Sequence, residues 1–486
     1  MPDLDLGATR SDEGFFLLRG AGQRPFEPPA GNGSGWRFCG TFRDSPPSLR
    51  DAVLDLIRNA RRKVFVTSFI LGDDELIDAL AETARRLTGG VYVISELSED
   101  SLRRGLAQLA ERGDVGQKVE AEKKRFVSLV HQGIAVRGHE NCHAKFVVVD
   151  DEVAWVGSAN LETRAFTLVG EAGVVLDDPR SVAALARMFA HMWTVGCRYE
   201  LPSFDSGYRV RDRGGERSPA AFTAPASSVV WTDGPAAAGL HRNLLDVIAG
   251  ARRDLVLASF SLNRLDEHPD LLLDPLAAAV ARGVRVRLFV RAMNDRDRHR
   301  RQAGLLHDLG VELVADDLNH AKAAVADGER GLLFSANFDA EHGLRPGTGI
   351  EVGARLDGTP ALPELSRYLE HAMDCATRRY IPTPTTRQLH DGLAAHWQTP
   401  WSHGETLEVS CPPDLWRALA AAPGPALWFQ QPGAPVEVAL GTLRLTVRPD
   451  GVSVSDGAAM LDLAQWMRLP AGKAKRGLCP ARLLAR

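Results

Sequence analysis

The sequence has few cysteines and no long apolar run. Its six cysteines form no C-x-x-C pair and show no zinc-like spacing: Cys39, Cys142, Cys197, Cys375, Cys411 and Cys479. This pattern excludes a disulfide framework and a structural zinc site, so we expect mostly buried free thiols. No run approaches the length of a bilayer span, and Met1 to Arg19 carries several charges instead of a basic and apolar leader. We therefore expect a cytoplasmic protein, although a membrane-surface enzyme is compatible with the same pattern.

A strong excess of charge of one sign is also missing. The chain has 58 Lys and Arg against 62 Asp and Glu, a formal net charge of −4 over 486 residues. Whole-molecule electrostatics therefore gives no argument for a polyanionic partner, and any such partner must be held by a local patch. The length predicts roughly two to four domains, each with its own apolar core.

Helical and strand patterns alternate over most of the chain. Apolar residues recur at helical spacing from Ser48, and the β-branched run Val64 to Phe69 is typical of a buried strand. Further helices are predicted near 74–87, 98–112 and 179–193, and further strands near 91–95, 134–137, 144–149, 153–156 and 174–176. This alternation predicts an α/β sandwich.

Part of this pattern occurs twice. Leu54 to Phe69 aligns without a gap with Leu245 to Phe260, and both stretches contain Ala-Arg-Arg and end in Ser-Phe. The period is much longer than the roughly 20–50 residues of a solenoid repeat, so it indicates a duplicated domain. We predict domains at 48–200 and 230–385, joined by a linker at 201–229. An irregular segment is expected at 1–47 and a small accessory domain of mixed or mainly β character at 386–486, with either a packing or a partner-binding role.

Each copy of the repeat carries one polar motif. The first motif contains His143, Lys145, Asp150, Ser158 and Asn160, and the second contains, at the same spacing, His320, Lys322, Asp327, Ser335 and Asn337. Strand alternation places the histidine and the lysine on one face, and the returning strand brings the serine and the asparagine to the same end. Lysines and amides stabilise charge on phosphate oxygens, while one imidazole attacks phosphorus and the other protonates the leaving oxygen. We therefore expect a phosphodiester bound between the copies.

These motifs resemble the signature of the phospholipase D superfamily, H-x-K-x4-D-x6-G-S-x-N. The first copy matches the signature fully, and the second has Phe334 where the family usually has Gly. The resemblance covers roughly residues 48 to 380. It implies two α/β/α sandwich domains related by a pseudo-two-fold axis, with one shared active site and neither a metal nor another cofactor.

The resemblance also implies a role for each motif residue. His143 would form a phosphohistidine intermediate, and His320 would act as general acid and then as base. The phosphate would be held by Lys145, Lys322, Asn160 and Asn337, with Ser158 and Ser335 in support. Glu171 and Glu351 would each orient a histidine, and Asp150 and Asp327 would make structural ion pairs at the hairpin turns. The ring of Phe334 would narrow the phosphate site or make the second half degenerate.

The signature does not distinguish nucleic acid from phospholipid substrates. Eight arginines against two acids lie between Arg282 and Arg301, and we take Arg291, Arg296 and Arg298 as substrate-binding candidates. Arginines suit repeated phosphate contacts along a polynucleotide, but anionic headgroups would also be attracted, and a solvated basic segment paired with nearby acids explains the cluster equally well.

Three hypotheses follow. The first is an intracellular nuclease, and the second is a phospholipid phosphodiesterase or phosphatidyltransferase. The third is a weakly catalytic nucleic-acid-binding module of a larger assembly, in which residues 386–486 would contact a protein partner. Because both half-sites lie in one chain, catalysis needs no dimer, and the sequence leaves the oligomeric state open.

Overall fold

The computed structural model describes residues 10–22, 24–27, 35–43, 48–96, 126–140, 142–202, 210–214, 224–232 and 238–393. It also describes short pieces at 4–5, 8 and 234 and, beyond residue 393, the strands given below. The helix expected at 98–112 lies outside these residues. None of the described helices is long and apolar enough to cross a membrane.

The first copy forms a nine-stranded sheet in the order β13-β12-β7-β6-β4-β8-β9-β11-β3, in which β4, β6 and β7 are parallel neighbours and the other pairs are antiparallel. Its elements are β3 (Arg37–Thr41), α1 (Ser48–Arg58), β4 (Val64–Thr67), β5 (Leu71–Gly72), α2 (Asp74–Arg86), β6 (Val91–Ser95), β7 (Ala135–Gly138), β8 (Phe146–Val149), β9 (Val153–Gly157), β10 (Leu161–Glu162), α5 (Thr163–Thr167), β11 (Glu171–Leu176), α6 (Pro179–His191), a π-helical turn (Met192–Gly196), β12 (Tyr199–Leu201) and β13 (Arg211–Asp212). The N-cap Asp73 accepts the Leu76 amide at 3.0 Å, and Pro179 follows the N-cap Asp178, so α2 and α6 begin where the sequence predicted.

The second copy repeats this arrangement in a sheet of order β14-β22-β20-β19-β15-β17-β18-β23-β2. Its elements are β2 (Phe15–Leu18), β14 (Val229–Trp231), α7 (Leu240–Gly250), β15 (Asp254–Ser259), β16 (Leu262–Asn263), a 3-10 turn (Pro269–Leu271), α8 (Leu273–Ala281), β17 (Arg285–Arg291), α9 (Asp297–Asp308), β18 (Glu312–Asp316), β19 (Ala323–Ala326), β20 (Arg330–Phe334), β21 (Phe338–Asp339), β22 (Val352–Arg355), α10 (Ala361–Asp374) and β23 (Arg378–Ile381).

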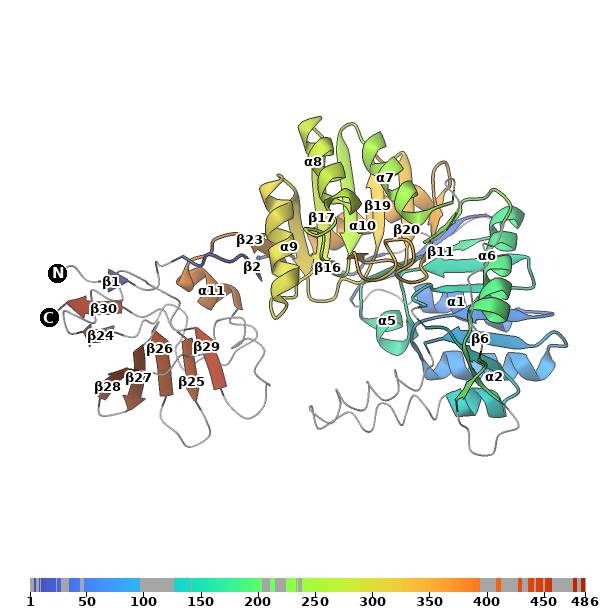
Figure 1. The fold of residues 1–486 in the computed structure, drawn as a ribbon, viewed down its shortest axis with the longest axis horizontal. Coiled ribbons are helices and arrows are strands. Elements are labelled where there is room, and N and C mark those ends of the chain that lie inside the picture. The colour runs from blue at the N-terminus through green and yellow to red at the C-terminus, as the bar shows by residue number, and fades with distance from the viewer. Residues whose placement is uncertain are drawn as a thin grey trace.

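The described core consists of three apolar clusters, two within the copies and one between them. One lies between the first sheet and α1 and α2, and a second lies between the second sheet and α7 and α8. The third is shared: it contains α6 and the inner face of the first sheet together with α10 and the inner face of the second. Figure 1 shows the two copies side by side in one body. The architecture is the predicted pair of α/β/α sandwiches, and the shared cluster fixes one copy against the other.

The segment 1–47, expected to be irregular, contains three strands, and two of them close the edges of the large sheets. Phe15 to Leu18 pair with β23 and close one edge of the second sheet, whereas Arg37 to Thr41 pair with β11 and close one edge of the first. The Gly and Pro residues that suggested irregular structure lie largely between these strands. The expected linker at 201–229 likewise contains β13 and begins and ends in strands.

The described elements after residue 385 are one helix and seven short strands. Helix α11 (Thr386–Leu393) packs against β2, and the strands are β24 (Glu408–Cys411), β25 (Leu427–Gln430), β26 (Val436–Leu440), β27 (Leu443–Arg448), β28 (Gly451–Asp456), β29 (Lys475–Leu478) and β30 (Arg482–Ala485). Five of them form the sheet β28-β27-β26-β25-β29, which includes the expected hairpin, and β30 pairs with β24 and with β1 (Leu4–Asp5). In Figure 1 these strands lie beyond α11, away from the two large sheets.

Candidate active site

The two motif histidines are brought together by backbone contacts between the copies. The amide of His143 donates to the carbonyl of Ile350 at 2.9 Å, and the amide of His320 donates to the carbonyl of Gly170 at 2.8 Å. Each of these acceptors directly precedes one of the candidate glutamates. The backbone of each histidine is therefore bonded to the residue that precedes the glutamate of the other copy.

The side chains continue this crossed arrangement. His143 Nδ1 lies 2.8 Å from Glu351 Oε1, and His320 Nδ1 lies 2.6 Å from Glu171 Oε1. A carboxylate at Nδ1 holds the proton on that nitrogen, so the lone pair of a neutral ring is on Nε2. Both glutamates orient a histidine as predicted, and each orients the histidine of the other copy.

The two motif serines bond to the glutamates. Both side chains are fully buried. Ser158 Oγ donates to Glu171 Oε2 at 2.5 Å and accepts from the Ala172 amide at 3.0 Å, and Ser335 Oγ bonds Glu351 Oε2 in the same way. The sequence predicted that the serines support phosphate binding. In the structure their hydroxyls hold the glutamates that orient the histidines.

Each motif lysine bonds to the backbone carbonyl of the histidine in its own motif. Lys145 Nζ donates to the His143 carbonyl at 2.5 Å, and Lys322 Nζ donates to the His320 carbonyl at 2.8 Å and lies 3.1 Å from His320 Nε2. Burial lowers the pKa of Lys145 to about 8 and that of Lys322 to about 7, although Glu171 and Glu351 act in the opposite direction. A bound anion would restore the charge of both ammonium groups.

Burial and the two lysines also shift the pKa values of the two histidines and the two glutamates. Burial lowers the pKa of His143, and burial with the neighbouring Lys322 holds the pKa of His320 well below its usual range. Burial raises the pKa of Glu171 to about 7. Burial also disfavours charge on Glu351, but His143 and Lys145 outweigh it, so that the pKa of Glu351 is lowered. Without an anion, the site therefore favours neutral imidazoles.

Both asparagines have a buried side-chain carbonyl oxygen without a hydrogen-bond partner among the described residues. Asn160 follows β9 and Asn337 follows β20, each two residues after the serine that holds a glutamate. The unpaired atom is an acceptor, so a phosphate would bond the amide nitrogen of the same side chain and not this oxygen. The role of both asparagines in phosphate binding stays a prediction.

Two aromatic residues at the histidines were missed by the sequence analysis. Phe69 packs edge-on against the His143 ring at 5.3 Å between centroids, and Phe260 packs against the His320 ring at 4.8 Å. They occupy equivalent positions, the last residue of the aligned Leu54 to Phe69 and Leu245 to Phe260 stretches. Their recurrence at the end of the aligned stretches is the signal that could have identified them as site residues.

Asp150 and Asp327 have a structural role, but through different contacts than expected. Both occupy the left-handed region at the hairpin turn, with φ of 57° and 55°. Each carboxylate accepts three backbone amides at 2.7–2.9 Å, from Arg61, Arg62 and Lys63 in the first copy and from 252–254 in the second. The predicted side-chain ion pairs are thus replaced by backbone amides, which fix the hairpin to the start of the neighbouring strand.

Phe334 is fully buried in the apolar cluster beneath α7 and α8. Its amide donates to the Lys322 carbonyl at 3.2 Å, as the amide of the equivalent Gly157 donates to the Lys145 carbonyl at 3.2 Å. In the first copy a side chain at Gly157 would meet the indole of Trp155, whereas the residue equivalent to Trp155 in the second copy is Leu332. A Cβ at Gly157 would also meet the backbone of Ala172 and Gly173, so the smaller Leu332 removes one of the obstacles to a side chain at this position. The second half therefore keeps the same histidine, glutamate and serine contacts as the first.

The arginine cluster divides into two groups. Four of its members bond to the chain itself: Arg282 to the Ile248 carbonyl in the last turn of α7, Arg285 to Glu312, Arg287 to Asp254 and Glu370, and the buried Arg300 to Glu13 and Asp297. Of the candidates, Arg291 lies over the Phe260 ring at 5.2 Å, near His320, and the exposed Arg296 and Arg298 line an open pocket of about 970 Å³. The cluster is therefore less available to a polynucleotide than its sequence suggested.

The arrangement suits a double displacement at phosphorus. One imidazole, with its proton held on Nδ1, can attack through Nε2, and the other can pass a proton to the leaving oxygen. The lysines and the asparagine amides are placed to stabilise the negative oxygens. The geometry is nearly symmetric, so the order in which the two histidines act stays the prediction made from the sequence.

The family model described as cardiolipin synthase, PLD-like domain, matches residues 53–193 and 244–371, which together are more than half of the chain. The chain belongs to this phospholipase D-like family. The two matched stretches are the two copies of the repeat, and together they include both histidines and both glutamates of the site.

Individual phospholipase D-like relatives match over shorter stretches. Phospholipase D Y of Dictyostelium discoideum is 28% identical over 33% of this chain and 37% of its own length. Probable cardiolipin synthase YwiE of Bacillus subtilis is 24% identical over 33% of this chain and 30% of its own length. The chain therefore matches about a third of the length of these curated relatives.

The solved structure of phosphatidylserine synthase from Haemophilus influenzae Rd KW20 has the same fold. It is 14% identical in sequence, has a TM-score of 0.51, and the match covers 71% of this chain and 87% of that chain. At this identity the likeness concerns the phospholipase D-like fold alone.

Proposed function

We propose that this chain is a phospholipid phosphodiesterase or phosphatidyltransferase that acts through a phosphohistidine on His143. The observation that carries the chemistry is the pair of crossed contacts, His143 with Glu351 and His320 with Glu171. They orient two imidazoles, each of which lies beside a buried lysine of its own motif. His320 gives a proton to the leaving alcohol and later removes one from the incoming water or alcohol.

The choice of lipid over nucleic acid rests on two supports. The named relatives, a phospholipase D and a probable cardiolipin synthase, are lipid enzymes by name. Half of the arginines that suggested a polynucleotide are bonded to the chain's own carboxylates and carbonyls. These supports favour the second of the sequence-based hypotheses over the nuclease and over the nucleic-acid-binding module. The expected cytoplasmic location and a protein partner for residues 386–486 stay proposals.

The test is a substrate panel with a matched variant. Wild-type protein and His143→Ala are incubated in EDTA with phosphatidylglycerol vesicles, phosphatidylcholine vesicles, RNA and single- and double-stranded DNA. The proposal predicts turnover of phospholipid by the wild type alone. Cleavage of nucleic acid with no lipid turnover would replace it with the nuclease, and equal lipid turnover by His143→Ala would contradict the mechanism.

A further inference from the structure

Arg43 and Asp316 form an ion pair across the junction of the two copies. Arg43 lies two residues after β3, the edge strand of the first sheet, and Asp316 is the last residue of β18 in the second sheet. The side chain of Asp316 is fully buried, and that of Arg43 is 23% exposed. Neither residue belongs to the two polar motifs. Their contacts nevertheless lead to one of the two catalytic pairs.

The carboxylate of Asp316 organises the turn that leads to His320. Its Oδ1 accepts the Leu318 amide at 2.9 Å. Its Oδ2 accepts the amide and the hydroxyl of Thr377 at 3.0 and 3.1 Å, and it also accepts from the Arg43 guanidinium. A carboxylate that bonds the backbone amide two residues later closes a turn of its own chain. The position of the Leu318 backbone therefore depends on Asp316.

The same turn is bonded to the segment before Glu171. The Gly170 amide donates to the Leu318 carbonyl at 2.7 Å, and the His320 amide donates to the Gly170 carbonyl at 2.8 Å. A Cβ at Gly170 would lie 3.0 Å from the Phe42 ring and 3.4 Å from the Leu318 oxygen, so the two segments are closely packed there. Glu171 follows directly, with its Oε1 2.6 Å from His320 Nδ1. The two backbone bonds thus set the distance between the catalytic partners.

Arg43 connects both segments. Its amide donates to the Leu168 carbonyl at 3.1 Å, two residues before Gly170, while its guanidinium donates to Asp316. Its φ of 53° lies in the left-handed region, which a residue with a side chain rarely adopts. Such a conformation persists where the surrounding contacts determine it, and it is concentrated at functional sites. One residue therefore holds the segment of Glu171 through its backbone and the turn before His320 through its side chain.

The first half has a different residue at the equivalent position. Asp316 lies four residues before His320, and the residue four before His143 is His139. The His139 ring lies 2.6 Å from the carbonyl oxygen of Glu140, within its own copy. The ion pair therefore distinguishes the His320 half from the otherwise similar His143 half.

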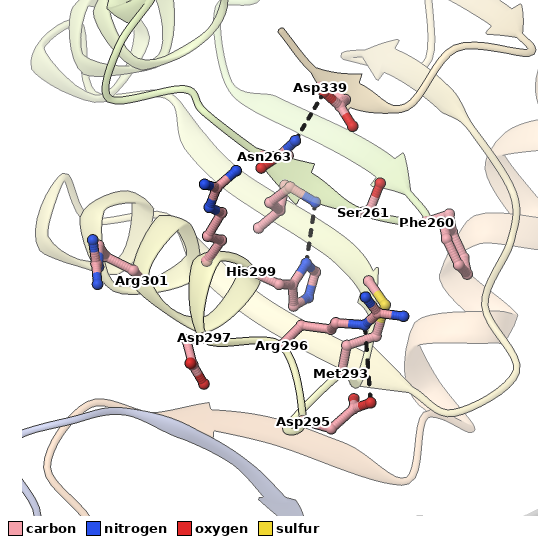
Figure 2. A pocket seen from close by; sticks show the side chains of 12 residues that line it. Phe260, Ser261, Asn263, Met293, Asp295, Arg296, Asp297, His299, Arg301 and Asp339 are labelled. Carbon is pink, nitrogen blue, oxygen red and sulfur yellow. Dashed lines mark hydrogen bonds and ion pairs between the residues drawn. The ribbon is translucent and has the colours of Figure 1, made fainter. Parts of the chain in front are cut away.

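We propose that Arg43 and Asp316, the inter-copy ion pair, are positioning residues that keep His320 aligned with Glu171 for the steps in which His320 moves a proton. This inference rests on the proposed function, because it assigns those proton transfers to His320. The ring of His320 packs against Phe260, which lines the open pocket shown in Figure 2, and the ion pair does not line that pocket. Its loss should therefore act through the orientation of His320.

Two kinds of leaving group depend differently on that orientation. In the first step His143 Nε2 bonds phosphorus, the bond from phosphorus to the headgroup oxygen breaks, and His320 gives that oxygen its proton. An alkyl alcohol needs this proton, whereas 4-nitrophenol leaves as its anion without one. A misaligned His320 therefore slows the first turnover of a lipid with an alcohol headgroup more than that of the matching 4-nitrophenyl ester. A general loss of folding slows both equally.

The kinetic test compares two lipids that share one phosphatidyl group. Arg43→Gln, Arg43→Lys, Asp316→Asn, wild type and the control Arg24→Gln are mixed in excess with vesicles of phosphatidylglycerol or of phosphatidyl-4-nitrophenol. The alcohol released in the first turnover is measured. Arg24 is a matched control, because it also precedes α1 and pairs with an aspartate of the second copy, the exposed Asp374, at 3.2 Å.

We expect Arg43→Gln and Asp316→Asn to lose roughly 10- to 100-fold on phosphatidylglycerol and less than about threefold on the 4-nitrophenyl ester. Arg43→Lys keeps the charge and should recover part of the loss, and Arg24→Gln should match the wild type. An equal loss on both lipids, or no loss on phosphatidylglycerol, would overturn the proposal.

A spectroscopic measurement separates this inference from the proposed function. Burial holds the pKa of His320 well below its usual range, so at pH 8 the ring is neutral and ¹⁵N NMR shows which nitrogen carries the proton. In the wild type Glu171 holds the proton on Nδ1. We expect Arg43→Gln and Asp316→Asn to mix the two tautomers of His320 and to leave His143 unchanged.

The outcomes of the two tests distinguish the claims. An unchanged His320 tautomer in both variants would overturn the positioning role even if the wild type turns over lipid. A changed tautomer in a protein that turns over no phospholipid would support the positioning role and overturn the proposed function alone.

Discussion

Glu351 Oε1 lies 2.8 Å from His143 Nδ1, although the two residues are 208 positions apart and belong to different copies of the repeat. The reciprocal pair, Glu171 and His320, is 2.6 Å apart. Each half therefore lacks the group that orients its own histidine. The site therefore needs two copies packed together, because neither copy alone contains a completed histidine and glutamate pair.

Glu351→Gln tests this crossed pairing. The substitution keeps the shape of the side chain but removes the charge that supports His143, so we expect turnover to fall roughly 10- to 100-fold. NMR titration should show that the pKa of His143 falls further, since Glu351 is the group that raises it against burial. Glu312→Gln, on the far end of the second sheet, is the control. A pKa change at His320 instead of His143 would contradict the pairing.

Binding of inorganic phosphate should be linked to proton uptake. Burial holds the pKa of Lys322 at about 7, so at pH 8 this ammonium is largely neutral in the empty site. An anion favours the charged form and raises the pKa, so binding at pH 8 takes up protons, and affinity falls as pH rises from 7 to 9. Calorimetry in buffers of different ionisation enthalpy measures the uptake. Binding at pH 8 without proton uptake would show that Lys322 is charged beforehand.

The first copy has Trp155 and Gly157 where the second has Leu332 and Phe334, and this difference leads to a prediction about stability. Phe334→Gly removes a fully buried ring from the second core, and we expect the free energy of unfolding to fall by about 3–5 kcal/mol with no gain in activity. Leu332→Trp/Phe334→Gly restores the first copy's combination and should regain part of the loss. Denaturant unfolding with a turnover assay measures both. Higher activity in Phe334→Gly would mean that the ring narrows the phosphate site after all.

Chelation of metal ions should leave the reaction unaffected. Among the described residues, Asp339, Glu341 and His342 form the one group of side chains placed to hold a metal ion, and their ligand atoms lie within 4.8 Å of one another. This group contains neither catalytic histidine. We expect full turnover in EDTA and in Asp339→Asn/Glu341→Gln. Loss of activity in EDTA that added Mg²⁺ restores would contradict the mechanism.

Local rules predicted the repeat and its elements well. Helical spacing from Ser48, the β-branched run from Val64 and the Asp cap before α2 all correspond to observed elements. Period-two alternation also placed His143 and Lys145 on one face. These features depend on residues a few positions apart, so one sequence contains enough information to find them.

Contacts between distant segments could not be predicted in the same way. Phe15 to Leu18 are a strand because β23 offers an edge, and nothing in their neighbours in sequence shows this. Ser158 was expected at the phosphate because its motif lies there, but its hydroxyl is used by Glu171, thirteen positions later. The crossing of the glutamates likewise depends on how the two copies pack.

The most direct test of the shared site is to identify the covalent intermediate. Wild type, His143→Ala and His320→Ala are mixed with phosphatidylglycerol labelled at phosphorus, quenched within one turnover, and digested for peptide mapping. The account predicts an acid-labile label on the peptide that contains His143, its absence in His143→Ala, and no comparable label on the peptide that contains His320. Lipid turnover without a labelled histidine, or a label that persists in His143→Ala, would contradict it.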